Sequence, residues 1–215
     1  MLLAITSILT SLGNLFLGVL VLRKNSKSPI NRFFFAFTIL LAAYILTSYA
    51  SVYLESPLLF RSTFVISVLL KTIGFLWVFS LCVGYNKNVA LIAYIVALAI
   101  ISGLVLEGFM IGNIKYGDQF FDYETGRGLI ASIIHNIAIL VYGTFLLTKT
   151  ILSQRGVVRK KLLLIAIGLL GFAFAAFVTS IVLPALKITS LTFLDIPLSL
   201  IFISLSAYAM IKYRS

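Results

Sequence analysis

Residues 189–215 read TSLTFLDIPLSLIFISLSAYAMIKYRS, and this stretch decides the fold class. It begins with hydroxyl residues, contains Asp195 and Pro197, and then stays apolar until it ends in KYRS. A helix of about 20 residues crosses the hydrocarbon layer of a bilayer, so residues 191–211 are long enough to span it. The basic, aromatic end that follows is typical of a membrane surface.

The composition of the whole chain agrees with membrane insertion. Hydrophobic residues make up 61% of the 215 positions, charged residues make up 11%, and the mean hydropathy is +1.15. A soluble domain of this composition would have more apolar surface than it could cover. The single cysteine, Cys82, excludes a disulfide within the chain. We therefore expect one all-α integral membrane domain over residues 1–215.

Seven apolar stretches of spanning length follow one another, each near the ~20 residues that a membrane helix needs. They cover about residues 2–22, 33–54, 58–83, 89–111, 129–150, 161–184 and 190–211. Continuous apolar runs of this length predict helices, because a barrel strand has only about 10 alternating residues. The first stretch has no basic residue before it and no cleavage site after it, so we interpret it as a retained span. The sequence predicts a seven-transmembrane-helix bundle.

The positions of the basic residues predict the orientation of this bundle. If the N-terminus is outside, twelve of the seventeen basic residues lie in inner segments. These are Arg23, Lys24, Lys27, Arg32, Lys87, Lys149, Arg155, Arg159, Lys160, Lys161, Lys212 and Arg214. The outer segments hold four basic residues, and all six acidic residues fall in the outer half. We therefore expect the C-terminus in the cytoplasm. The net charge of +11 then indicates contact with anionic lipid head groups, and nucleic-acid binding is not expected.

The longest connection is GNIKYGDQFFDYETGRG, residues 112–128, on the predicted outer face. Its glycines and aromatic residues favour a small β-hairpin that caps the bundle. A solvated loop that only connects two spans is the alternative.

Small residues form a stripe in the sixth span, at Gly168, Gly171, Ala175 and Thr179. Their spacing of three and four residues places them on one helical face. Small side chains let helix backbones approach closely within a membrane. We interpret the stripe as intramolecular packing, with a homodimer contact as the alternative.

Ionisable residues inside spans are the most informative for function, because charge in hydrocarbon persists mainly where it faces protein or a wet cavity. Lys71 lies near the middle of the third span, and its long stem can reach toward Asp195 or Glu107 in the outer half. The candidate polar pocket comprises Lys71, Glu107, His135, Asn136, Thr192 and Asp195. Two interpretations remain open: a buried ion pair that only fixes helix order, or an outward-open pocket for a small ligand of unknown identity.

Catalytic motifs are missing from the sequence. It contains no phosphate-binding glycine loop, no HExxH and no Ser/His/Asp set. His135 is the only histidine, so we expect no metal site. A retinal protein would need a lysine deep in the last span, whereas Lys212 lies only at its inner end. We therefore expect no enzyme activity in this chain and no cofactor.

Three segments point to a known family. The last span ends in AYAMIKYRS (207–215), the preceding span ends in VTSIVLPAL (178–186), and the first inner loop is RKNSKSPINRFFFAF (23–37). In their order and spacing these segments resemble the N-terminal seven-transmembrane region of bacterial and archaeal membrane histidine kinases. The resemblance implies a sensor in a prokaryotic cell membrane that precedes a cytoplasmic kinase or another output domain. Such a domain would be missing from this sequence or supplied by a partner.

Two classes of function fit these observations. In a sensory input module, Asp195 and Pro197 would respond at the outer end of the last span, and Tyr208 and Lys212 would pass the change inward. The alternative is a small-solute or proton transporter that uses Lys71, Asp195 and Glu107 as a relay. The chain shows no internal repeat or pair of interrupted helices typical of transporters.

Overall fold

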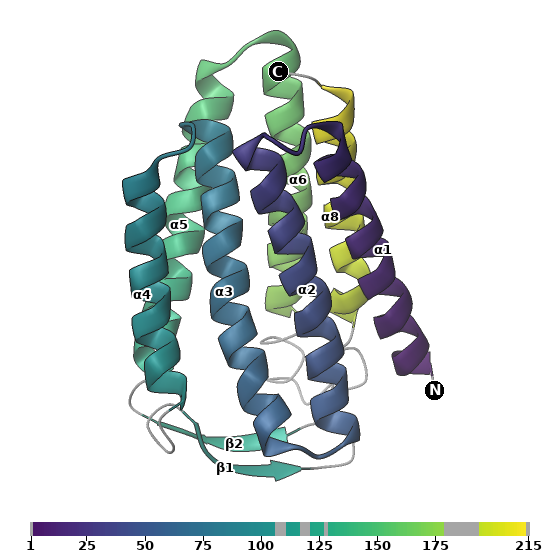
Figure 1. The fold of residues 1–215 in the computed structure, drawn as a ribbon, viewed down its shortest axis with the longest axis vertical. Coiled ribbons are helices and arrows are strands. Elements are labelled where there is room, and N and C mark those ends of the chain that lie inside the picture. Colours follow the sequence, from purple (N-terminus) through teal and green to yellow (C-terminus); the bar gives the residue numbers. More distant parts are fainter. Residues whose placement is uncertain (1, 106–110, 117–120, 127–128, 179–193, 214–215) are drawn as a thin grey trace.

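The computed structural model describes residues 2–105, 111–116, 121–126, 129–178 and 194–213. Within these residues the chain forms seven helices and one two-stranded sheet (Figure 1). The helices are α1 (Leu2–Lys24), α2 (Pro29–Tyr53), α3 (Pro57–Cys82), α4 (Lys87–Val105), α5 (Leu129–Ser153), α6 (Gly156–Phe177) and α8 (Asp195–Lys212). The strands are β1 (Ile111–Tyr116) and β2 (Phe121–Thr125).

Prolines and glycines set several helix ends. Pro29 and Pro57 stand at the first positions of α2 and α3, where a missing N–H removes no helical hydrogen bond. The Ser56 side chain caps α3 by accepting a hydrogen bond of 3.4 Å from the amide of Leu59. After α3, Gly84 adopts a φ of 102°, a left-handed conformation that ends the helix.

Each helix overlaps one of the predicted apolar stretches, and the differences lie at the ends. The fourth stretch was expected to reach residue 111, but α4 ends at Val105 and Ile111 opens a strand. The sixth was expected to begin at residue 161, but α6 begins at Gly156. Arg159 and Lys160 are good helix formers, so the helix continues beyond its apolar part.

Four of these helices, α1, α2, α3 and α5, are long and apolar enough to cross a membrane. Two shorter apolar helices cover Lys87–Gly103 within α4 and Ile196–Lys212 within α8. This length and composition agree with the membrane class expected from the sequence.

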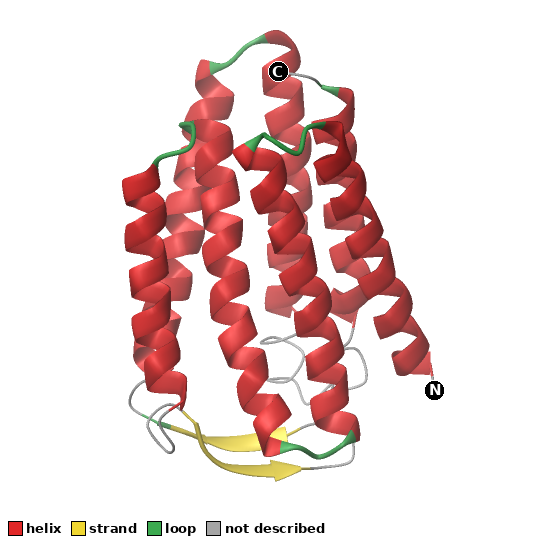
Figure 2. Cartoon of the chain, viewed as in Figure 1, coloured by secondary structure: helices red, strands yellow, loops and turns green. Residues whose placement is uncertain are grey.

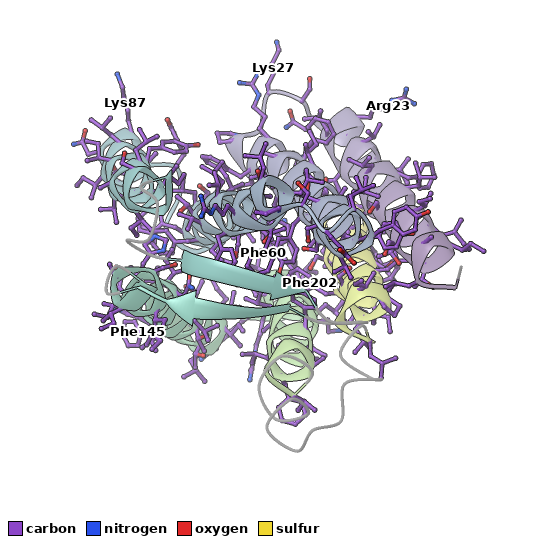
Figure 3. The ribbon with its side chains drawn as sticks, turned by 90° about the horizontal axis from the view of Figure 1, so that it is seen from below. Arg23, Lys27, Phe60, Lys87, Phe145 and Phe202 are labelled. Atoms are coloured by element: carbon purple, nitrogen blue, oxygen red, sulfur yellow. The ribbon has the colours of Figure 1, made fainter. Side chains whose placement is uncertain are left out.

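The helices form two layers. Seen from below, α4, α3, α2 and α1 make one row, and α5, α6 and α8 make the second (Figure 3). Neighbouring helices within each row run antiparallel, and short connections join α1 to α2, α2 to α3, α3 to α4 and α5 to α6. Between the rows, α1 packs against α8 and α3 packs against α5, and both of these pairs are parallel (Figure 1). The contacts close a ring in the order α1, α2, α3, α5, α6, α8, with α4 packed mainly on α3.

The expected hairpin is confirmed. β1 and β2 pair antiparallel, with Tyr116 opposite Phe121 and an irregular register between Ile111 and Ile114. The hairpin lies across one end of the bundle, the end that also holds the α2–α3 loop and the N-terminus (Figure 2). The last described residues of α8 lie at the opposite end.

Aromatic side chains from both layers form the centre of the core. Trp77 of α3 lies 5.1 Å from Phe34 and 6.3 Å from Phe202, measured between ring centroids. Phe202 of α8 also contacts Phe37 of α2 at 6.0 Å and Phe172 of α6 at 5.7 Å. Four helices therefore meet around the Phe202 ring, which is 1% exposed. Such ring pairs stabilise beyond the area that they bury.

The polarity of α1 is inverted relative to a helix in a soluble protein. The first part of its buried face, at spacings of three and four residues, is polar and consists of Ser7, Thr10, Ser11 and Asn14, and the same face continues with Gly18 and Val21. Its exposed residues are large and apolar and include Ile5, Ile8, Leu9, Leu12 and Phe16. Apolar side chains gain little by leaving lipid, so hydrogen bonds and close packing hold membrane helices together.

Candidate functional site

Lys71 lies on the side of α3 that faces α5. The ring of Phe75, one turn further along α3, lies 5.9 Å from the ring of Tyr142 on α5. The two helices run parallel, so residues four positions before this contact also lie at one level. Lys71 is therefore level with residue 138 of α5. His135 is three residues before that level, roughly 4.5 Å along the axis at the rise of an α-helix. A lysine side chain can extend over that distance.

The structure brings three of the predicted pocket residues together between α3 and α5. Lys71, His135 and Asn136 are all half-buried, and the charge of Lys71 acts on the His135 ring. Among the residues that the structure describes, Nδ1 of His135 and Oδ1 of Asn136 are buried without a hydrogen-bond partner. Buried polar atoms normally have a hydrogen-bond partner, so these two atoms are unsatisfied although neither is exposed at the surface.

The structure does not describe the side chains of the other three predicted pocket residues. Glu107 and Thr192 lie outside the described residues, and Asp195 is described only as the first residue of α8. None of the described side chains forms an ion pair with Lys71. The predicted pairing of Lys71 with Asp195 or Glu107 therefore stays a prediction.

The α3–α5 site combines hydrogen-bond donors with acceptors. Lys71 supplies a cation with three hydrogen-bond donors, and Asn136 Oδ1 supplies an acceptor. His135 can accept or donate at Nδ1, depending on its tautomer. In the described part of the chain, no group of three or more His, Cys, Asp or Glu residues is placed to hold a metal ion. These groups are of the kind that bind small polar molecules or transfer a proton.

A second polar contact, between α1 and α8, was not predicted. Asn14 is fully buried, and its Nδ2 donates to Oγ of Ser199 at 3.3 Å. Oγ of Ser199 in turn donates to the carbonyl of Ile196 at 2.6 Å. The sequence signal for this contact is ITSILTSLGN, residues 5–14, where uncharged polar residues recur at helical spacing. Asn14 Oδ1 has no partner among the described residues.

The predicted signal-transmitting residues lie at the two ends of α8. Pro197 is the third residue of α8 as described, where a backbone N–H has no intrahelical acceptor. Its ring removes no hydrogen bond from the described helix. The expected loosening at this turn stays a prediction, because residue 193, which would accept a bond from position 197, lies outside the described residues. At the other end, Lys212 donates a hydrogen bond to the hydroxyl of Tyr208, which raises the pKa of Lys212. Lys212 also lies over the rings of Tyr208 and Tyr213.

The small-residue stripe of α6 is divided between different environments. A Cβ atom at Gly168 would lie 3.0 Å from the Phe202 ring, so this glycine packs against α8. Gly171 is exposed, and no described atom lies within 4 Å of a Cβ built there. Ala175 is half-buried, and Thr179 lies outside the described residues.

Comparison with known proteins adds no assignment. No protein family model matches the chain, and neither a curated protein nor a solved structure is significantly similar to it.

Proposed function

We propose that this chain is a seven-span sensory input module of a prokaryotic cell membrane. It detects a stimulus on its outer side or within the membrane and passes the signal through α8 to a cytoplasmic output of the histidine-kinase type. In this proposal all seven described helices cross the bilayer, the hairpin lies outside, and the C-terminal end of α8 lies inside.

The distribution of charge supports this orientation. The α1–α2 loop, the α3–α4 loop, the α5–α6 turn and the end of α8 lie at one end of the bundle (Figure 1). Eleven of the twelve basic residues assigned to the inner side belong to described segments at or near that end. The twelfth, Arg214, lies outside the described residues. Glu55 and both acidic residues of β2 are at the hairpin end. Positive charge is retained on the cytoplasmic side of membrane proteins.

The placement of α8 is the observation that carries the proposal. This helix begins at the hairpin end, packs against α1 and α6, and ends at the basic end of the bundle. Its buried residues run along its length and are Ser199, Phe202, Ile203, Ser206, Ala207, Ala209 and Met210. A shift of α8 must therefore repack the core, so two arrangements of the helix can be discrete states. A stimulus can shift the equilibrium between these two arrangements only if it binds them with different affinities.

The experiment joins a kinase output domain after Arg214 and measures its activity with and without candidate stimuli. Asp195→Asn and Pro197→Ala alter the outer end of α8, whereas Asp122→Asn removes a carboxylate from the hairpin at the same end and serves as the control. We expect the two α8 variants to change kinase output at equal expression and equal thermal stability. Wild-type output from both of them would contradict signalling through the outer end of α8.

A transporter remains the second candidate because of Lys71. A lysine inside the membrane, near a histidine whose buried Nδ1 has no described hydrogen-bond partner, can take part in proton transfer to a solute. Proton uptake into proteoliposomes that depends on the wild-type protein and is lost in Lys71→Met would favour this function. A kinase response that persists in Lys71→Met, without any proton flux, would favour the sensor.

A further inference from the structure

The turn between α5 and α6 is a strongly basic exposed segment of the described chain. Arg155, Arg159 and Lys160 are exposed on it, and Lys149 is exposed near the end of α5. Residues 152–160 are all exposed. No acidic residue of the described segments lies at this end of the bundle, so the four cations have no carboxylate of this chain beside them.

The start of α6 increases this positive potential. Arg155 occupies the capping position, its side chain makes no capping hydrogen bond, and the first turn contains no acidic residue. The N-terminal end of a helix carries a partial positive charge and favours an anion. Cations at this end repel that charge, so Arg159 and Lys160 destabilise the turn unless a negative group lies beside them.

Exposed apolar side chains adjoin the same cations. Leu152 is 74% exposed, Val157 is 54% exposed and Val158 is 38% exposed. A free phosphate ion has no apolar part and would leave these side chains without an apolar contact. A phospholipid offers a phosphate to the cations and an acyl chain to the apolar residues, so it matches both halves of the surface.

We propose that the α5–α6 turn, residues 149–160, is a binding site for the head group of an anionic phospholipid. Arg155, Arg159 and Lys160 bind the phosphate, and Leu152 and Val157 contact the upper part of the acyl chain. The proposal rests on the membrane insertion proposed above, but it is independent of signalling.

The test uses native mass spectrometry of the purified full chain, titrated with phosphatidylglycerol or with phosphatidylcholine of the same acyl chains. The test variant is Arg155→Gln/Arg159→Gln/Lys160→Gln. The matched control is Arg23→Gln/Lys27→Gln/Lys87→Gln, which removes the same charge from side chains that point away from the bundle on the other layer (Figure 3). Because three basic residues near an anionic surface are removed, we expect the test variant to bind phosphatidylglycerol roughly 100-fold more weakly.

The control variant should keep wild-type affinity for phosphatidylglycerol. Equal loss in the two variants would show only a general charge effect and would overturn the site, as would equal wild-type affinity for the two lipids. Displacement of the lipid by inorganic phosphate at comparable concentration would assign the site to a free anion instead.

If circular dichroism shows that the triple variant is unfolded, Arg159→Gln alone replaces it and should give a smaller, selective loss of affinity for phosphatidylglycerol. Insertion into the bilayer is read separately, from recovery of the protein in the membrane fraction.

Discussion

Asn14 of α1 and Ser199 of α8 are joined by a hydrogen bond of 3.3 Å, although 185 positions separate them in the chain. The same two helices meet at Gly13 and Leu200, and Lys24 donates a hydrogen bond to the carbonyl of Ile211 at the basic end. In all three contacts the paired residues are separated by nearly the same number of positions in the chain. The first and the last described helices are therefore packed in parallel and in register.

Breaking the bond between Asn14 and Ser199 should destabilise the bundle. We expect Ser199→Ala to lower the free energy of unfolding by about 1 kcal/mol, because the buried Asn14 amide loses its acceptor. Ser204→Ala, on the exposed side of the same helix, is the control and should have little effect. Thermal unfolding in detergent measures both. The double variant with Asn14→Leu should lose less than the sum of its single changes, and strict additivity would argue against the coupling.

Gly18 should tolerate no side chain. A Cβ at Gly18 would lie 3.0 Å from Cβ of Thr38 and closer still to its hydroxyl oxygen. Thr38 is fully buried and donates to the carbonyl of Phe35 at 2.8 Å, so it has little room to move. We expect Gly18→Ala to cost about 1–3 kcal/mol of stability through overpacking.

Gly143 of α5 provides the matched control for this change. No described atom lies within 4 Å of a Cβ built at Gly143. Alanine is the better helix former, so Gly143→Ala should be neutral or stabilise by up to about 1 kcal/mol. Similar melting temperatures for the two alanine variants would contradict the close packing of α1 on α2.

The predicted partnership of Lys71 with Asp195 can be decided by a double-mutant cycle. If the two charges are paired inside the bundle, Lys71→Met leaves the carboxylate unpaired and should cost about 3–5 kcal/mol. Adding Asp195→Asn should then restore the melting temperature. Additive losses, or restoration by Glu107→Gln in place of Asp195→Asn, would reject this pairing.

The orientation predicts the behaviour of reporter fusions. A reporter that becomes active only outside the cytoplasm should stay inactive when it is fused after residue 213. The same reporter inserted between residues 117 and 120, within the hairpin connection, should be active. The opposite pattern would reverse the proposed topology.

Much of the fold was predictable because each span is encoded locally. A continuous apolar run long enough to cross a bilayer forms a helix with its own backbone hydrogen bonds, so the seven helices of the described residues could be predicted at nearly correct positions. The hairpin was predictable from the glycines and aromatic residues of residues 112–128. Helix ends were less accurate, because charged residues such as Arg159 continue a helix beyond its apolar part.

The sequence alone therefore determined the helices, the hairpin and the asymmetric distribution of charge, since these depend on short stretches of residues. Only the tertiary structure decided which helices meet. The parallel contact of α1 with α8 depends on the shapes of surfaces that are distant in the chain, such as Gly13 against Leu200. The closeness of Lys71 to His135 likewise follows from the packing of Phe75 on Tyr142. Hydropathy carries no information on such contacts, because in a membrane nearly every helix face is apolar and packing selects the partners.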